Sequence, residues 1–157
     1  MTNTKATHPT ARMFFTDGSS HGNPGKSGWA NVEALPDGTL VERSGHLPHA
    51  TNNIAELSAI KDVIMRTPEG TGVHIVSDSM YCIQALTDWL PNKWKGNGFR
   101  TAKGKPIENR DLILEIDALM QPREITFEHV KAHSGHPANE RADALANNAA
   151  LCMEIGQ

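Results

Sequence analysis

The sequence predicts one α/β domain with a mixed sheet of five strands flanked by helices, in the order βββαβααβα. Two patterns predict this architecture. Three strand-like stretches come first and are separated by short turns, which favours antiparallel hairpins. Two further short apolar strands then alternate with helical stretches, and such β-α-β crossovers add parallel strands to the same sheet. At 157 residues, 38% of them apolar, the chain is long enough to bury one self-sufficient core.

The three antiparallel strands are expected at Arg12–Thr16, Trp29–Leu35 and Leu40–His46. A glycine-rich stretch that begins at Asp17 separates the first strand from the second. The residues Pro36-Asp37-Gly38 form a turn between the second and the third.

The remaining elements follow in order along the chain. Thr51 or Asn52 caps a helix that runs to about Arg66, because Pro68 and Gly70 stop it. Five more elements are expected at Val73–Ser77 (strand), Ser79–Leu90 (helix), Glu108–Met120 (helix), Ile125–Val130 (strand) and after Pro137 (helix), with an irregular polar segment between the helices. The domain is expected to span residues 12–152, with a flexible tail at 1–11 and another at 153–157.

Composition narrows the class of protein. A net charge of −3 argues against a protein that coats nucleic acid by bulk electrostatics, so any such contact must be local. Cys82 and Cys152 are too few for a disulfide framework; both are expected as small buried thiols in a reducing compartment. No apolar run approaches the ~20 residues of a membrane span, and residues 1–11 lack a signal peptide. We therefore expect a cytoplasmic monomer without an obligate protein partner.

Two carboxylates follow predicted strands. Asp17 comes after the first strand and Asp78 after the fourth, so both are expected at one carboxyl edge of the sheet, where open α/β sheets place ligands. Each also has a structural interpretation. Asp17 suits a turn before Gly18, and Asp78 suits the cap of the next helix.

Glu56 lies on the apolar side of the first helix. The apolar stripe is formed by Leu57, Ile60, Val63 and Ile64. At 100° per residue Glu56 lies about 50° from the centre of that stripe, so its side chain is directed to the sheet. Burial of an unpaired charge costs several kcal/mol, and the position therefore requires a cationic partner. An arginine is one candidate; a metal ion shared with Asp17 and Asp78 is the better one.

The last helix carries a fourth acid. Its core stripe is expected at Ala138, Ala142, Leu145 and Ala149, with Asn139, Asp143 and Asn147 on an adjacent polar face. Taken alone, Asp143 is a solvated helix residue. The preceding loop, however, holds His133 near the helix start, and a mobile imidazole moves protons well near pH 7.

Four motifs together resemble a known family. They are Asp17-Gly18-Ser19 with Gly22-Asn23-Pro24-Gly25, Thr51-Asn52-Asn53 with Glu56-Leu57, Ser77-Asp78-Ser79 with Tyr81, and the stretch from His133 to Asp143. Over about residues 12–150, in order and spacing, they resemble type 1 ribonuclease H of the bacterial kind. The resemblance implies a ribonuclease H-like fold. It also implies endonucleolytic cutting of the RNA strand of RNA/DNA hybrids, which leaves 3′-hydroxyl and 5′-phosphate ends.

The resemblance assigns roles to the site residues. Asp17, Glu56, Asp78 and Asp143 match the metal-binding catalytic acids, and His133 matches a histidine that assists attack or product release. The residue types agree with this chemistry. Two Mg²⁺ ions about 3.5–4 Å apart generate a nucleophile and stabilise the leaving group in phosphodiester hydrolysis. Carboxylates without cysteine suit Mg²⁺, or Mn²⁺ as a substitute, better than Zn²⁺.

Substrate contacts follow from the same resemblance. Asn23, Asn52 and Asn53 match positions that contact the hybrid in its minor groove, where RNA displays its 2′-hydroxyls. Thr51 and Asn109 resemble phosphate contacts on the DNA strand, and Asn139 is a further candidate contact. The structural alternative for Asn23, Asn52 and Asn53 is that these three asparagines serve turns and caps. Relatives often carry Arg two residues before the threonine, whereas this chain has His49.

The segment Pro91–Ile107 supplies local positive charge. It contains Lys93, Lys95, Arg100, Lys103 and Lys105 and no acidic residue, with Trp89, Trp94 and Phe99 interleaved. Basic side chains beside aromatic ones suit a groove for a nucleic-acid backbone, and the family's basic protrusion lies here. We expect Trp89, Lys93, Trp94 and Lys95 to contact substrate. The alternative is a solvated loop.

Two other functions stay open at this point. A nuclease of related fold that acts on DNA would use the same acids, and a catalytically silent module would bind the hybrid without cutting it. The first differs in its substrate and the second in having no cleavage activity.

Overall fold

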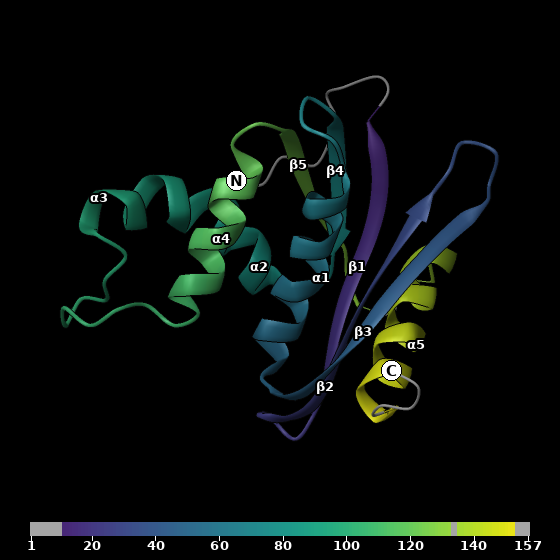
Figure 1. Ribbon diagram of the computed structural model, residues 1–157, viewed down its shortest axis with the longest axis horizontal. Coiled ribbons are helices and arrows are strands. Elements are labelled where there is room, and N and C mark those ends of the chain that lie inside the picture. Colours follow the sequence, from purple (N-terminus) through teal and green to yellow (C-terminus); the bar gives the residue numbers. More distant parts are fainter. Residues whose placement is uncertain (1–10, 133–134, 153–157) are drawn as a thin grey trace.

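The computed structural model describes residues 11–132 and 135–152 (Figure 1). Its centre is a five-stranded sheet in the order β3-β2-β1-β4-β5. The strands β1 (Arg12–His21), β2 (Gly25–Ala34) and β3 (Leu40–Ala50) pair antiparallel, whereas β4 (Gly72–Ser77) and β5 (Glu124–His129) run parallel to β1. The predicted mixed sheet is confirmed. Apart from Ala11, the tails expected at 1–11 and 153–157 lie outside the described residues.

Helices cover both faces of the sheet. They are α1 (Asn52–Arg66), α2 (Met80–Gln84), the π-helix η1 (Ala85–Trp94), α3 (Lys95–Asn97), α4 (Arg110–Met120) and α5 (Pro137–Leu151). Figure 1 shows α1, α2 and α4 on one side of the sheet and α5 on the other, with α3 projecting away from it. Within the described part of the chain, no helix is both long enough and apolar enough to cross a membrane.

Each face of the sheet buries its own hydrophobic cluster. The larger cluster joins α1, α4 and the α2–η1 region to the sheet and includes Phe14, Leu57, Ile60, Ile75, Ile83, Ile113, Ile116 and Phe127. The smaller one lies under α5 and includes Phe15, Val32, Val76, Ala138 and Ala142. Because neighbouring strand residues point to opposite faces, Phe14 and Phe15 anchor one cluster each.

The first strand is longer than the sequence predicted. Its parallel pairing with β4 ends at Thr16↔Ser77, but its antiparallel pairing with β2 continues to His21↔Lys26. The long partner strand supplies the additional hydrogen bonds. Asp17 therefore lies inside β1 and not after it, although it still lies directly beyond the parallel ladder.

The segment after Ser79 is the largest departure from the prediction. The helix was expected over Ser79–Leu90, yet the chain continues through η1 to Trp94 and through α3 to Asn97. Pro91, which lacks an N–H donor, lies inside η1. The wide π turn accommodates the proline inside the helix. The following residues form a bonded loop, because the Ile107 N–H donates to the Phe99 carbonyl at 3.1 Å.

Two predictions on the closing helix were wrong. The fully buried alanines of α5 are Ala138, Ala142, Ala146 and Ala150, whereas Leu145 and Ala149 are half-buried. The close approach of α5 to β2 explains this, since a Cβ on Gly28 would lie 2.4 Å from the Ala150 nitrogen. Cys82 is buried as expected, but Cys152 follows the end of α5 and is exposed.

Candidate active site

Two neighbouring parallel strands bring Asp17 and Asp78 together. Thr16 and Ser77 are the last paired residues of β1 and β4, so the next residue of each strand is an aspartate at the same sheet edge. Ser79 caps α2, with its Oγ accepting from the Cys82 N–H at 3.2 Å. The helix cap is therefore Ser79, and the carboxylate of Asp78 belongs to the cluster described below.

Gly18 allows α1 to bring Glu56 to the same edge. A Cβ at position 18 would lie 2.4 Å from the backbone nitrogen of Glu56, so only glycine permits this approach of α1 to β1. The helix begins where Thr51 Oγ1 accepts from the Ile54 N–H at 3.1 Å. The predicted apolar face of α1 is buried, and Glu56 is only 5% exposed.

The three carboxylates form one cluster. Asp17, Glu56 and Asp78 each offer an oxygen, and these oxygens lie within 4.8 Å of one another. It is the one cluster of potential metal ligands found among residues 11–132 and 135–152. Oxygen donors at such spacing, from one turn of helix and two strand ends, match the ligand preference of a hard divalent cation.

Burial and mutual repulsion raise the pKa values of two of these acids. The pKa of Asp17 rises to about 8, first because the group is buried, then because of the charge of Asp78 and a hydrogen bond with Asp143. The pKa of Glu56 rises well above its usual value through burial and through the charges of Asp17 and Asp78. Within the described residues, Glu56 Oε1 is buried without a hydrogen-bond partner. A bound cation would relieve both the repulsion and the unsatisfied oxygen, so the donor set fits a metal.

Asp143 and His133 stand differently in the structure. Asp143 lies half-buried on α5 and hydrogen-bonds with Asp17, so it adjoins the cluster without belonging to the group of three. His133 lies outside the described residues, and its assigned role stays a prediction.

Four of the predicted substrate residues line one polar pocket of about 320 Å³, namely Asn23, Thr51, Asn53 and Asn109, together with Glu108. The Asn52 N–H donates to Asn23 Oδ1 at 2.9 Å and so holds the β1–β2 turn against α1. Asn109 Nδ2 donates to the Tyr81 hydroxyl at 3.1 Å and makes no cap bond to α4. Asn23 lies in the β1–β2 turn, as its structural alternative stated, and Thr51 is the expected cap of α1.

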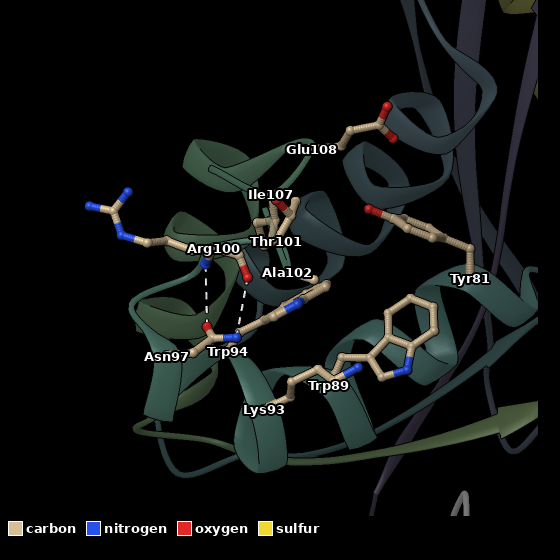
Figure 2. Close-up of a pocket in the computed structure, with 10 residues that line it drawn as sticks. All are labelled: Tyr81, Trp89, Lys93, Trp94, Asn97, Arg100, Thr101, Ala102, Ile107 and Glu108. Carbon is tan, nitrogen blue, oxygen red and sulfur yellow. Dashed lines mark hydrogen bonds between the residues drawn. The ribbon is translucent and has the colours of Figure 1, made fainter. Parts of the chain in front are cut away.

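A second pocket, of about 500 Å³, lies against η1 (Figure 2) and is lined by Tyr81, Trp89, Lys93, Trp94, Asn97, Arg100, Thr101, Ala102, Ile107 and Glu108. The ring centroids of Trp89 and Trp94 are 5.7 Å apart, and those of Tyr81 and Trp89 are 6.1 Å apart. This pocket combines aromatic walls with a lysine, as the sequence predicted for a backbone groove.

Two other predicted substrate residues, Lys95 and Asn139, lie elsewhere. Lys95 is paired with Asp117 at 3.2 Å and does not line the aromatic pocket. Phe99 packs against the larger core. Asn139 is 3% exposed, so the polar face expected around it is in fact buried at this position.

Tyr81 was part of a sequence motif without an assigned substrate role, and Glu108 was not singled out from the sequence. Tyr81 and Glu108 both line the aromatic pocket, and Glu108 also lines the polar one. Glu108 has one recognisable signal in the sequence, since it is the first acid after the basic segment 91–107.

Comparison with known proteins identifies the family. The sequence model of RNase H matches residues 9–151. The chain belongs to the RNase H family. It is similar to the ribonuclease H of Cupriavidus necator, with 41% identity over 85% of this chain and 91% of that protein.

Solved structures of RNase H proteins also resemble this chain. LC9-RNase H1, described as a type 1 RNase H with the type 2 active-site motif, aligns with a TM-score of 0.73 and 27% identity over 91% of this chain and 74% of its own. The foamy viral protease-reverse transcriptase in complex with an RNA/DNA hybrid aligns with a TM-score of 0.79 and 26% identity; 92% of this chain matches 20% of that one. Both likenesses agree with the mixed sheet and its helices.

Proposed function

We propose that this chain is an endoribonuclease that hydrolyses the RNA strand of RNA/DNA hybrids and leaves 3′-hydroxyl and 5′-phosphate ends. Its relatives are ribonucleases H by name, and one structural neighbour was solved with such a hybrid. The observation that carries the proposal is the three-carboxylate cluster of Asp17, Glu56 and Asp78, with the unsatisfied oxygen of Glu56 inside it.

The cofactor that we propose is Mg²⁺, with Mn²⁺ as a substitute and two ions when substrate is bound. Asp17, Glu56, Asp78 and Asp143 would hold it. When bound, such ions lower the pKa of a water and stabilise charge on the phosphate and on the leaving oxygen. All-oxygen donors without cysteine favour these hard cations over Zn²⁺.

The protein residues have separate tasks in this proposal. Burial first, and then the charges of neighbouring carboxylates, raise the pKa values of Asp17 and Glu56, so binding of a cation would favour loss of their protons. Asp143, from α5, orients Asp17 through their hydrogen bond. For His133 we propose proton transfer during attack or product release.

The polar pocket would take a backbone phosphate. It lies where the first turn of α1 meets Asn109 at the start of α4, and the N–H groups at helix starts attract anions. Asn23, Asn52 and Asn53 offer amides that both donate and accept, which suits the 2′-hydroxyls of the RNA strand. Trp89, Lys93 and Trp94 would support the other strand beside η1.

A cleavage assay tests the proposal. Wild-type protein with Mg²⁺ should cut the RNA of a labelled hybrid, should spare duplex DNA and duplex RNA, and should lose activity in EDTA. Asp78→Asn should be inactive, whereas Glu69→Gln, an exposed acid in the turn before β4, should cut normally. Cutting of duplex DNA would favour a DNA nuclease, and binding without cutting would favour a silent module.

We propose a cytoplasmic monomer that needs no obligate protein partner. Light scattering of the purified protein, with and without hybrid, checks the monomer.

A further inference from the structure

Glu108 occupies an unusual place for an acid in a nucleic-acid-binding protein. It lines the polar pocket together with Asn23, Thr51, Asn53 and Asn109, and it also lines the aromatic pocket of Trp89 and Lys93. It is the one acidic residue in the lining of either pocket.

Contacts around Glu108 connect the two pockets. Asn109, its neighbour, lines the polar pocket and donates to the hydroxyl of Tyr81, which lines the aromatic one. Figure 2 shows the Glu108 carboxylate on the side of the Tyr81 hydroxyl and apart from the Trp94 indole. The negative charge of Glu108 contributes to the raised pKa of Tyr81, after the larger effect of burial. The carboxylate thus lies at the junction of the two pockets.

The negative charge of Glu108 repels an anion, although the other residues of both pockets suit one. Every other feature of the junction favours an anion: amide donors, the starts of α1 and α4, and Lys93. A carboxylate accepts hydrogen bonds only, so it cannot donate to a phosphate oxygen. Glu108 is exposed, so its carboxylate is open to an incoming ligand.

We propose that Glu108 is a substrate-site residue that weakens the binding of the two pockets to the hybrid backbone and so favours release of cut product. This inference rests on the proposed function, because it assumes that a backbone phosphate enters the junction. Repulsion between exposed charges is modest and screened by salt, so Glu108 acts as an adjustment of affinity and not as a barrier.

The experiment compares two variants of equal charge. Glu108→Gln and Glu115→Gln each change the net charge from −3 by one unit, but Glu115 lies on α4, paired with Lys61 at 2.9 Å and outside both pockets. Hybrid binding is measured by fluorescence anisotropy in EDTA, where no cutting occurs, over a series of salt concentrations. Steady-state cleavage with Mg²⁺ gives KM and kcat.

Glu108→Gln should bind the hybrid about threefold to fivefold more tightly at low salt, and the gain should shrink at high salt. Its plot of log K against log salt should steepen by up to about 0.9, the contribution of one phosphate. KM should fall more than kcat changes. Glu115→Gln should match wild type in binding and cleavage.

Other results would overturn the inference. Weaker binding by Glu108→Gln would mean that the carboxylate accepts a hydrogen bond from substrate. Unchanged binding with a lowered Tm would mean that Glu108 serves only the start of α4, where an acid is favourable. An equal gain in hybrid affinity in Glu115→Gln would mean that the effect comes from net charge and not from the position of Glu108. Each of these outcomes is distinct from failure of the proposed function, which would appear as absent hybrid cleavage by the wild-type protein.

Discussion

At the scale of single residues, Glu56 has the strongest physical requirement for a cation. It is 5% exposed, and its Oε1 lacks a partner within the described residues. We expect Glu56→Gln to lose hybrid cleavage by at least about 100-fold, because the amide removes both a ligand and a charge. The metal-free variant should nevertheless melt higher than wild type at about pH 8, since one repelling carboxylate is gone. Calorimetry in EDTA checks the second expectation, and an unchanged or lower Tm would contradict it.

Asp143 differs from the other acids by its place at the margin of the cluster. It reaches Asp17 through a hydrogen bond but is not among the three oxygens within 4.8 Å. The cleavage activity of Asp143→Asn should therefore be at least about tenfold higher than that of Asp17→Asn, as expected for a group that supports a ligand. Single-turnover cleavage of the two variants compares them directly. Equal losses would place Asp143 among the direct ligands.

At the scale of elements, the site depends on how closely α1 approaches β1. Gly18→Ala would force a Cβ to within 2.4 Å of the Glu56 nitrogen. We expect this change to lower the free energy of unfolding by about 1–3 kcal/mol, and cleavage should fall as Glu56 shifts from Asp17. Gly96→Ala is the matched control, because a Cβ there meets no atom within 4 Å. Urea unfolding of both variants tests the prediction; a Gly18→Ala protein as stable as the control would refute it.

The end of η1 separates two lysines that look alike in the sequence. Lys93 lines the aromatic pocket, whereas Lys95 is paired with Asp117 on α4. Lys93→Ala should weaken hybrid binding and reduce the salt slope by about 1, and Lys95→Ala should change the slope much less. Anisotropy titrations over a salt series measure both slopes. Equal reductions in the two variants would contradict the assignment.

The elements also show what the sequence can and cannot predict. Helical periodicity placed the buried face of α1 correctly, including Glu56, because burial there follows a single repeat. The helix expected at Ser79–Leu90 was too short, because the chain continues as π turns that hold Pro91 inside η1. The junction at Glu108 was not foreseen, because it arises only when α4 lies beside α1 and α2. Pairings across the sheet and between helices are tertiary facts that a local pattern does not contain.

At the scale of the whole molecule, the net charge is negative but one segment is locally basic. The chain carries a net charge of −3, and its clustered acids repel one another, while the segment 91–107 holds five of the fifteen Lys and Arg residues and no acid. Binding of an anionic hybrid is therefore local, and stability without metal depends on where the acids are protonated. The site is held together by the sheet and the two cores at some cost in stability, which a bound cation would relieve.

Because these acids are destabilising when charged, we expect the free energy of unfolding to depend on pH. In the folded, metal-free protein the pKa of Asp17 is raised from 3.8 to about 8, and that of Glu56 is also raised. Between pH 3.8 and about pH 8, Asp17 in the folded state holds a proton that the unfolded chain has released, so the free energy of unfolding falls as the pH rises through this range. Melting curves in EDTA should show this decline, and Asp17→Asn should flatten it. Mg²⁺ should raise the Tm more at about pH 8 than at about pH 5, because the cation replaces the protons. If the Tm of the wild-type protein falls with pH no more steeply than that of Asp17→Asn, the raised pKa of Asp17 does not affect stability.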